Sequence, residues 1–504
     1  MDAQTFLLHL IRIKFGFMAC FHYIFVPLTL GLIVSVACME TAFVRTRAKA
    51  WELAARFWFG LFLLGWVAGV ATGYPLRAQL LSDWGNYFVY VKPMLDQVVP
   101  IETALGPVML VGVVTLAIFG SRLYPGIRTA ITWGLVGLMT CQAVTILSVN
   151  AWMQHPTREL FLNPMALSTV THVLCAALVC ASTVICGISI IYLHRGRHLP
   201  VARVSLRAGL LLGALSSVFV IVTGHLSAEH VARYQPMKFA ALEGLWREEH
   251  GPAAWIAFAL PDSVAQANRI EIRLPYLMSV LTGHGLSGSP PGIREVLAEQ
   301  QERIRRAARD TAGSSDLQGY RALYTQEKIR SHQPVSDDEL IQRAAARTVP
   351  DVPVLFAGFR LMAMIGLGML AAFTLGLLFE ERLQHKSRRW LVLAVPALLP
   401  LPWLATLAGW IITEMGRQPW AVYGYLPTFQ GARLPTLAQG VWGTISIVSA
   451  YLLLAVAFVL LSLRLVWLGP TARAAGTITT ELTALTSPTW QPRLAATSKQ
   501  VSCK

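Results

Sequence analysis

Nine long apolar stretches are the feature that most constrains what this chain can fold into. A helix needs roughly 20 apolar residues to cross the hydrocarbon core of a bilayer. Only 14% of the 504 residues are charged and the mean hydropathy is +0.53, whereas soluble domains carry about 25% charged residues. The sequence therefore predicts an all-α membrane protein and excludes an ordinary soluble enzyme or a disordered chain. The predicted spans are 16–39, 57–75, 98–120, 130–152, 166–193, 206–228, 353–379, 390–413 and 439–467.

A long polar stretch, 229–352, separates the sixth and seventh spans. It holds 31 charged residues, 15 basic and 16 acidic. Within it, residues 293–310 pair acidic and basic side chains at helical spacing, which predicts an amphipathic helix. We therefore expect membrane helices over 1–228 and 353–468, an extramembrane lobe over 229–352, and a flexible tail over 469–504.

Lysine and arginine in the short loops predict the orientation, because such residues accumulate on cytoplasmic loops. Fourteen lie in the loops after spans 1, 3, 5 and 7, and five lie in the loops after spans 2, 4 and 8. This asymmetry places the N-terminus and the long loop outside and the C-terminus inside, although Arg12 and Lys14 count against it. The net charge of +15 is thus spread over short loops, which argues against nucleic-acid binding.

Ionisable side chains inside the predicted spans are energetically costly, so each is a candidate functional residue. They are His22, Glu102, His172 and Arg360, and Met362 follows two residues after the arginine. In the predicted orientation all of them lie in the outer half of the membrane. Two histidines and a methionine at one depth in a helical bundle suggest haem ligands. Each also has a structural alternative: a hydrogen bond between helices for a histidine, a salt bridge for the glutamate, and core packing for the methionine.

Several short motifs make the chain resemble subunit I of the bacterial cytochrome bd quinol oxidases over nearly its whole length. Together they are far more specific than any one alone, and the predicted span count, loop position and orientation agree with them. The motifs are FHYIFVPLTLG (21–31), FW (57–58), GVATG (69–73), NAWMQHP (150–156), KFAALEGLW (238–246), LPD (260–262), FRLM (359–362), GRQPW (416–420) and LGP (468–470).

The resemblance implies that quinol is oxidised at the outer face, near the long loop. Lys238 and Glu243 match the loop residues linked to quinol oxidation in the family. His172 and Met362 match the axial ligands of a low-spin haem b. Arg360 would pair with a carboxylate of that haem.

The resemblance also implies an oxygen-reducing centre with one or two high-spin haems, of the b or d type. His22 matches an axial ligand there, and Glu102 matches the carboxylate beside the oxygen-binding haem. Oxygen would be reduced to water, generating a proton motive force without pumping. The implied partners are a smaller membrane subunit II, a possible small single-helix accessory subunit and the lipid bilayer of the bacterial cytoplasmic (inner) membrane.

Three positions depart from the family pattern. A glutamate expected eight residues after Glu102 is Leu110, so the proton path from the cytoplasm must differ or be absent. A haem-ligating glutamate expected in span 9 is Phe458, which cannot bind iron. That haem is then missing, has an open site, or takes a ligand from another helix or a water. Pro107 in span 3 removes one helical N–H and can kink the span.

These departures leave more than one function open. The leading hypothesis is a terminal quinol:oxygen oxidoreductase with a divergent oxygen-reducing centre. The alternative is a quinol-oxidising haem b subunit that passes electrons elsewhere without reducing oxygen. A transporter or channel is a third possibility, but the sequence has no inverted repeat to support it.

Overall fold

The structure is a computed structural model that describes residues 3–248, 254–278, 290–331, 334–383 and 389–474. Within these ranges, nine helices are long and apolar enough to cross a membrane, and each overlaps one of the nine predicted spans. Eight of them are α1 (Ala3–Thr46), α2 (Lys49–Ser82), α3 (Gly85–Phe119), α4 (Pro125–Gln154), α5 (Pro164–Arg195), α6 (Leu199–Tyr234), α12 (Val352–Leu378) and α17 (Leu437–Ala474). The other spans Ala394–Met415, and it combines the end of α14 (Arg389–Leu398) with α15 (Leu401–Met415).

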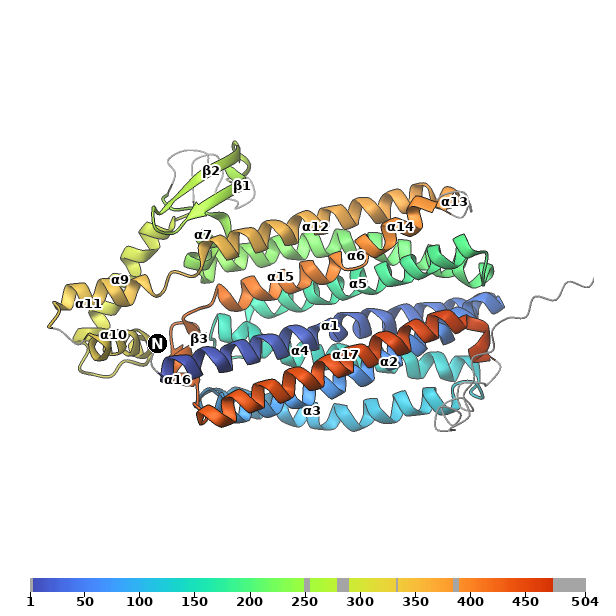
Figure 1. The fold of residues 1–504 in the computed structure, drawn as a ribbon, viewed down its shortest axis with the longest axis horizontal. Coiled ribbons are helices and arrows are strands. Elements are labelled where there is room, and N and C mark those ends of the chain that lie inside the picture. The colour runs from blue at the N-terminus through green and yellow to red at the C-terminus, as the bar shows by residue number, and fades with distance from the viewer. Residues whose placement is uncertain (1–2, 249–253, 279–289, 332–333, 384–388, 475–504) are drawn as a thin grey trace, which may run out of the picture.

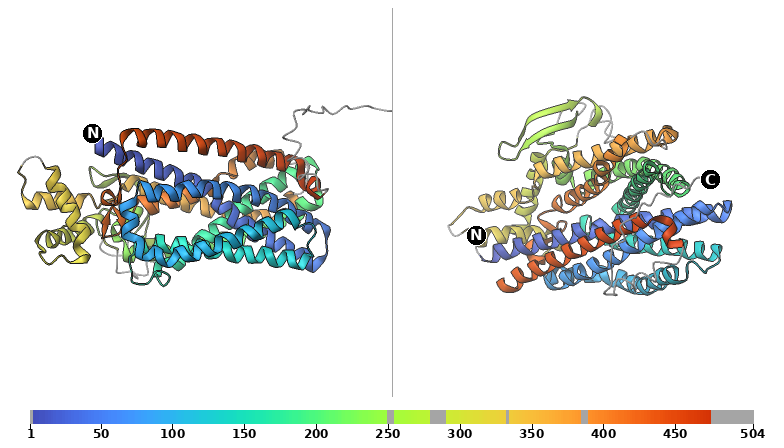
Figure 2. Two further views of the ribbon diagram at one scale, coloured as in Figure 1. Left: turned by 90° about the horizontal axis from the view of Figure 1, so that it is seen from below. Right: turned by 45° about the vertical axis from the view of Figure 1, so that its right-hand side comes forward.

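The long helices form two groups that lie side by side (Figures 1 and 2). One contains α1 to α4 with α17, and the other contains α5, α6, α12 and α15. A glycine allows the groups to meet: a Cβ on Gly31 of α1 would lie 2.2 Å from the carbonyl oxygen of Ala177 on α5. Close approach at small residues is how membrane helices gain packing energy, so this seam brings the two halves into direct contact.

Prolines act differently in two of the spans. The predicted span 390–413 is divided into α14 (Arg389–Leu398) and α15, with Pro400 at the break. Proline cannot donate the backbone hydrogen bond that would continue the helix. In contrast, α3 continues through Pro93, Pro100 and Pro107 without interruption.

The long polar stretch lies at the end of the bundle where α1 begins (Figure 1). The predicted amphipathic helix is confirmed as α9 (Ile293–Arg309), one face of which is buried. The stretch also holds α7 (Pro236–Glu243), the short 3-10 helix η1 (Ser315–Leu317), α10 (Gln318–Arg330), α11 (Asp337–Ala346) and an antiparallel hairpin of β1 (Trp255–Asp262) and β2 (Ala267–Leu274). The hairpin was not predicted, although the alternation of apolar and charged residues in β2 is the pattern of β-structure.

Shorter elements complete both ends of the bundle. Three short elements connect α15 to α17 at the end of the bundle that holds α7. They are β3 (Trp420–Val422), β4 (Leu426–Pro427) and α16 (Thr428–Gly431). At the opposite end, α13 (Glu380–Leu383) follows α12. The predicted flexible tail, 469–504, is wrong over its first residues, because α17 continues to Ala474 after a break at Gly469. The rest of the predicted tail, from 475 onward, lies outside the described residues.

The two N-terminal basic residues that opposed the predicted orientation have partners at the α7 end. The Lys14 ammonium lies 2.5 Å from the Asp83 carboxylate, and both side chains are nearly buried. The Arg12 guanidinium donates to the side chain of Gln418. The charge of Lys14 is thus neutralised locally, which weakens its value as a topology signal.

Candidate functional site

His172 on α5 is held in one orientation by hydrogen bonds to α6. Its Nδ1 lies 3.0 Å from the Val220 carbonyl oxygen and 3.3 Å from the Thr223 hydroxyl, both on α6. Because a carbonyl can only accept, Nδ1 carries the proton and Nε2 keeps its lone pair. Gly224 lies against the ring, where a Cβ would be 3.1 Å from its Cε1. The histidine is therefore orientated by α6, with one nitrogen left to bind a metal.

Met362 on α12 lies in the same group of helices as His172. Its sulfur faces Gly409 of α15, where a Cβ would be only 3.2 Å from the sulfur. The side chain packs on the apolar cluster that joins α7, α9, α12 and the hairpin. The absence of a side chain at Gly409 gives the thioether room that any other residue would restrict.

Arg360 and Glu243 form a buried ion pair between α12 and α7. The Arg360 Nη2 lies 2.7 Å from the Glu243 Oε2, and its Nε and Nη2 also donate to the Ile256 carbonyl of β1. The rings of Phe356 and Trp255 stack on the guanidinium at 4.5 and 4.6 Å. Burial raises the pKa of the Glu243 carboxyl, and the charge of Arg360 opposes that rise.

Lys238 faces a different side of α7 and contacts α4 and α15. Its Nζ lies 2.9 Å from the Gln154 Oε1 and 3.3 Å from the Thr413 carbonyl oxygen, and the residue is 3% exposed. Burial lowers the pKa of Lys238 to about 7. Glu243 follows Lys238 by five positions, which puts the two side chains on different faces of the helix. The predicted pair is thus on one short helix but not in one cluster.

A run of hydrogen bonds leads from Lys238 to a carboxylate that the sequence analysis missed. The Gln154 Nε2 donates to the Asn150 Oδ1, and the Asn150 Nδ2 donates to the Glu414 Oε1, each at 2.9 Å. Arg417 forms an ion pair with the other oxygen of Glu414. Glu414 falls one residue beyond the predicted span 390–413, so a search for ionisable groups inside the spans did not find it. Its place just before the GRQPW motif was the available signal.

His22 on α1 is orientated by α2. Its Nδ1 lies 2.9 Å from the Thr72 hydroxyl, which itself donates to the carbonyls of Ala68 and Gly69. Because the Thr72 hydroxyl proton is used in these bonds, the His22 Nδ1–H donates to the hydroxyl oxygen. The His22 Nε2 then keeps its lone pair. Gly73 lies beside the ring, with a Cβ-to-Cε1 distance that would be 3.1 Å.

Glu102 on α3 is less tightly held than the other predicted residues. Its nearest basic partner is Arg77 of α2, at 3.9 Å, and 21% of the Glu102 side chain is exposed. Leu110, on the same helix, is 50% exposed. The outward face of α3 therefore presents these positions away from the packed centre of the chain.

Phe458 on α17 packs as a hydrophobic residue. Its ring contacts the ring of Phe25 on α1 edge-on, with centroids 5.0 Å apart. On the other side of α1, the Tyr23 ring contacts Trp410 of α15 at 5.2 Å. Glu414 follows Trp410 by four residues, so it lies on the same face of α15. The Glu414 carboxylate itself contacts Asn150 of α4 and Arg417.

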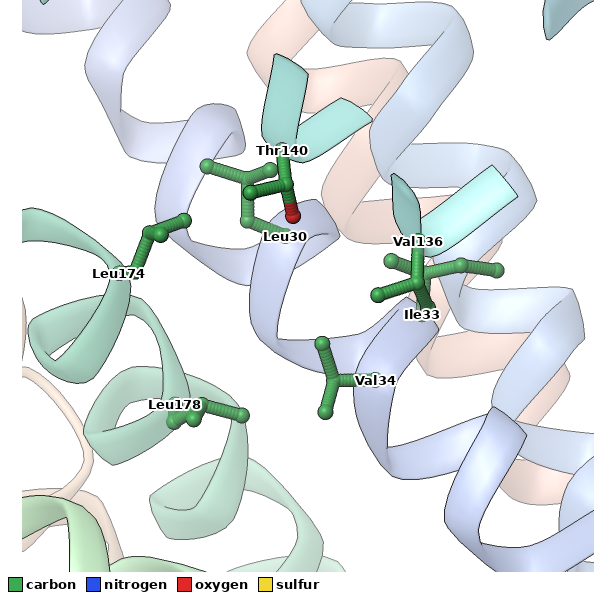
Figure 3. Close-up of a pocket in the computed structure, with 7 residues that line it drawn as sticks. All are labelled: Leu30, Ile33, Val34, Val136, Thr140, Leu174 and Leu178. Carbon is green, nitrogen blue, oxygen red and sulfur yellow. The ribbon is translucent and has the colours of Figure 1, made fainter. Parts of the chain in front are cut away.

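An apolar cavity of about 170 Å³ lies between α1, α4 and α5 (Figure 3). Its lining is aliphatic except for the hydroxyl of Thr140. A buried water needs two to four polar partners, which this lining does not offer. The cavity therefore has neither the polar groups nor the size of a catalytic pocket.

These features define a class of protein: a helical membrane protein with axial-ligand-type side chains in its core and buried charges at one end. Residues 10–470 match the family described as "Cytochrome bd terminal oxidase subunit I". The chain belongs to this family, and it is a quinol oxidase subunit, an oxidoreductase of the respiratory chain. Members of the family bind haem, generally pair with a subunit II, and are multi-pass proteins of the bacterial inner membrane.

Two relatives and one solved structure illustrate the similarity. The chain is 31% identical to "Cytochrome bd-II ubiquinol oxidase subunit 1" of Escherichia coli, covering 92% of this chain and 96% of the relative. It is 30% identical to "Cytochrome bd ubiquinol oxidase subunit 1" of Bacillus subtilis, covering 90% and 92%. The fold resembles the bd oxidase of Geobacillus thermodenitrificans with a TM-score of 0.75 at 20% identity, covering 91% of this chain and 98% of the other.

The residues present fit the haem that the family implies. His172 and His22 each keep one ring nitrogen as a lone-pair donor, and glycines lie beside both rings and beside the Met362 sulfur. The Arg360 Nη1 is buried and has no hydrogen-bond partner in the part of the chain that the structure describes. A buried, unpaired N–H is costly, and a haem carboxylate would satisfy it.

Proposed function

We propose that this chain oxidises quinol at the α7 end of the bundle, on the outer face of the inner membrane, and passes the electrons to oxygen, which is reduced to water. The observation that carries this proposal is the position of α7. This helix presents buried Lys238 on one side and the Glu243–Arg360 pair on another. The same region carries His172 and Met362, so charged groups and redox ligands share one end of the chain.

The ligand assignments follow from the free lone pairs and the space beside them. His172 and Met362 would bind a low-spin haem b, and Arg360 would hold one of its carboxylates. His22 would bind a high-spin haem of the b or d type, with Glu102 as the nearby carboxylate. Bound haem would supply the one-electron chemistry that a two-electron quinol donor and a four-electron oxygen acceptor both require. Because Phe458 cannot bind iron, a second high-spin haem would be missing, would keep an open site, or would take its ligand from another helix or a water.

Lys238 is suited to accept a proton from quinol. As a neutral amine it donates one N–H to Gln154 and one to Thr413, and its lone pair remains for a quinol hydroxyl. Its pKa near 7 places the change of charge at physiological pH. Glu243, which Arg360 keeps in place on another face of α7, would be a second charged group at the quinol-oxidising end. Protons would leave on this side, whereas oxygen reduction would consume protons from the inside, so a proton motive force would arise without pumping.

Leu110 and the exposed face of α3 indicate which functions other parts of the complex would supply. Leu110 cannot carry protons, so protons from the cytoplasm would follow a route that avoids this position. The exposed outward face of α3 would be covered by subunit II, the smaller homologous partner that members of the family use. A small single-helix accessory subunit would belong to the same assembly.

A reduced-minus-oxidised spectrum of the purified complex, with haem extraction and oxygen uptake, tests the proposal. We expect a low-spin haem, at least one high-spin haem, and quinol-dependent oxygen uptake. His172→Ala and Met362→Leu should remove the low-spin signal, whereas His22→Ala should remove a high-spin signal and leave the low-spin one. A single low-spin haem without oxygen uptake would instead support a quinol-oxidising electron-transfer subunit, the alternative that Phe458 keeps open.

A further inference from the structure

The hairpin β1–β2 exposes an apolar face, which we define as Phe258, Leu260, Ile270, Ile272 and Leu274. Each of these five side chains is between 43% and 58% exposed. Phe258 and Ile272 are direct partners across the two strands. Such a cross-strand apolar pair normally packs on a core, so a face of this kind left in water would be an aggregation site.

The opposite face of the hairpin is the one that docks on the protein. Ile256 and Ala259 are buried in the cluster that includes α7 and α12. Asn268 donates to the Gly244 carbonyl and accepts from the Trp246 ring nitrogen. The hairpin therefore already packs on the protein through this opposite face, and the exposed apolar face is not needed for that packing. Its outward side needs a different apolar environment.

The depth of the hairpin identifies that environment. The Ile256 carbonyl at the base of the hairpin accepts hydrogen bonds from Arg360. At a rise of 1.5 Å per residue, α12 is about 40 Å long, and Arg360 lies about 12 Å from its first residue. Since hydrocarbon occupies about 30 Å of such a span, the base lies near the level where α12 enters the bilayer. The hairpin stands beside this end of α12 (Figures 1 and 2), whose Val354 and Leu361 are themselves exposed.

We propose that the apolar face of the hairpin lies in the interfacial layer of the bilayer and contacts the upper acyl chains of the neighbouring lipids. It cannot go deeper, because each strand has an unpaired edge whose N–H and C=O groups need water or lipid headgroups. Exposed Tyr276 just beyond β2 suits the same layer, in which tyrosine and tryptophan accumulate.

This contact gives the hairpin a role beside the proposed quinol site. Its docked side covers Arg360, and its outward side would lie in lipid. A lipid-soluble quinol would therefore meet the hairpin before it reaches α7. The inference concerns lipid contact, however, and holds whether or not the chain reduces oxygen.

Photocrosslinking in the complete complex tests the proposal without requiring turnover. p-Benzoylphenylalanine would replace Ile272 in the complex, reconstituted in phospholipid nanodiscs, and a second variant would carry it at Glu271, the adjacent residue on the other face of β2. We expect lipid adducts at position 272 to exceed those at 271 several-fold by mass spectrometry. Equal lipid labelling at both positions, no adduct at 272, or an adduct at 272 with a protein chain would overturn the proposal.

Discussion

The two ends of the proposed electron path are held in different ways. At the α7 end, Arg360, Glu243 and Lys238 are each less than 9% exposed and hydrogen-bonded within this chain. At the His22 end, Glu102 is partly exposed on a helix whose outward face is open, and its nearest basic group is 3.9 Å away. A buried charge needs a partner, and at the α7 end this chain supplies partners for Glu243, Lys238 and one side of the Arg360 guanidinium. The His22 end has the geometry of a site that an assembly completes.

The largest effect is expected from breaking the ion pair at the α7 end. Arg360→Met would leave the Glu243 carboxylate buried and unpaired, which costs about 3–5 kcal/mol. We expect a marked fall in the thermal unfolding midpoint of the purified protein. The double variant Arg360→Met with Glu243→Gln should recover most of that loss, because the remaining side chain is neutral. A double variant as unstable as the single one would show that packing, and not charge, holds this end.

A smaller effect is expected from two variants, one in the hydrogen-bond run from Lys238 and one on the His22 helix contact. Glu414→Ala should leave the haem signals in place and lower the rate of quinol oxidation, because Glu414 ends the run of hydrogen bonds from Lys238. Phe458→Leu should leave the spectrum unchanged and cost about 1 kcal/mol, since it alters only an edge contact with Phe25. Loss of a haem signal in either variant would contradict these placements.

The smallest effect is expected in the pH dependence of quinol oxidation, which Lys238 would set. Its folded pKa is lowered from an ordinary value of 10.5 to about 7, so the amine becomes a proton acceptor as the pH rises through 7. Quinol oxidation should therefore increase across that pH, and Lys238→Met should flatten the step. In addition, the unfolded chain binds more protons than the folded one between pH 7 and 10.5, so this residue makes stability rise with pH in that window. A wild-type profile without a step near pH 7 would contradict this role.

Much of the candidate site was predictable because membrane burial makes a charged or polar residue conspicuous. His22, His172, Glu102 and Arg360 stood out in spans that contain almost nothing else that ionises. Met362 was identified mainly through its neighbour Arg360 and the resemblance of that motif. The hydrogen bonds that orientate these groups were not predictable, because Val220, Thr223 and Thr72 are ordinary residues whose role depends on which helix they face.

Glu414 and Gln154 show where sequence reasoning lost information. Glu414 lies at the rim of a span, where a charge is inexpensive and draws no attention. Gln154 is neutral and ends α4, yet it joins Lys238 to Asn150. Both matter because α4, α7 and α15 converge, and no local pattern records which helices converge.

The sequence by itself determined that the chain is a bundle of membrane helices with a few candidate functional side chains in its spans, because apolar length and rare buried charges are properties of the residues themselves. Only the tertiary structure decided how those side chains are orientated, and that Arg360 pairs with Glu243 across 117 positions. It also decided that β1–β2 turns its apolar side outward. Each of these depends on contacts between segments that are far apart in the chain. Such contacts form, and stabilise the fold, only when the helices have packed together.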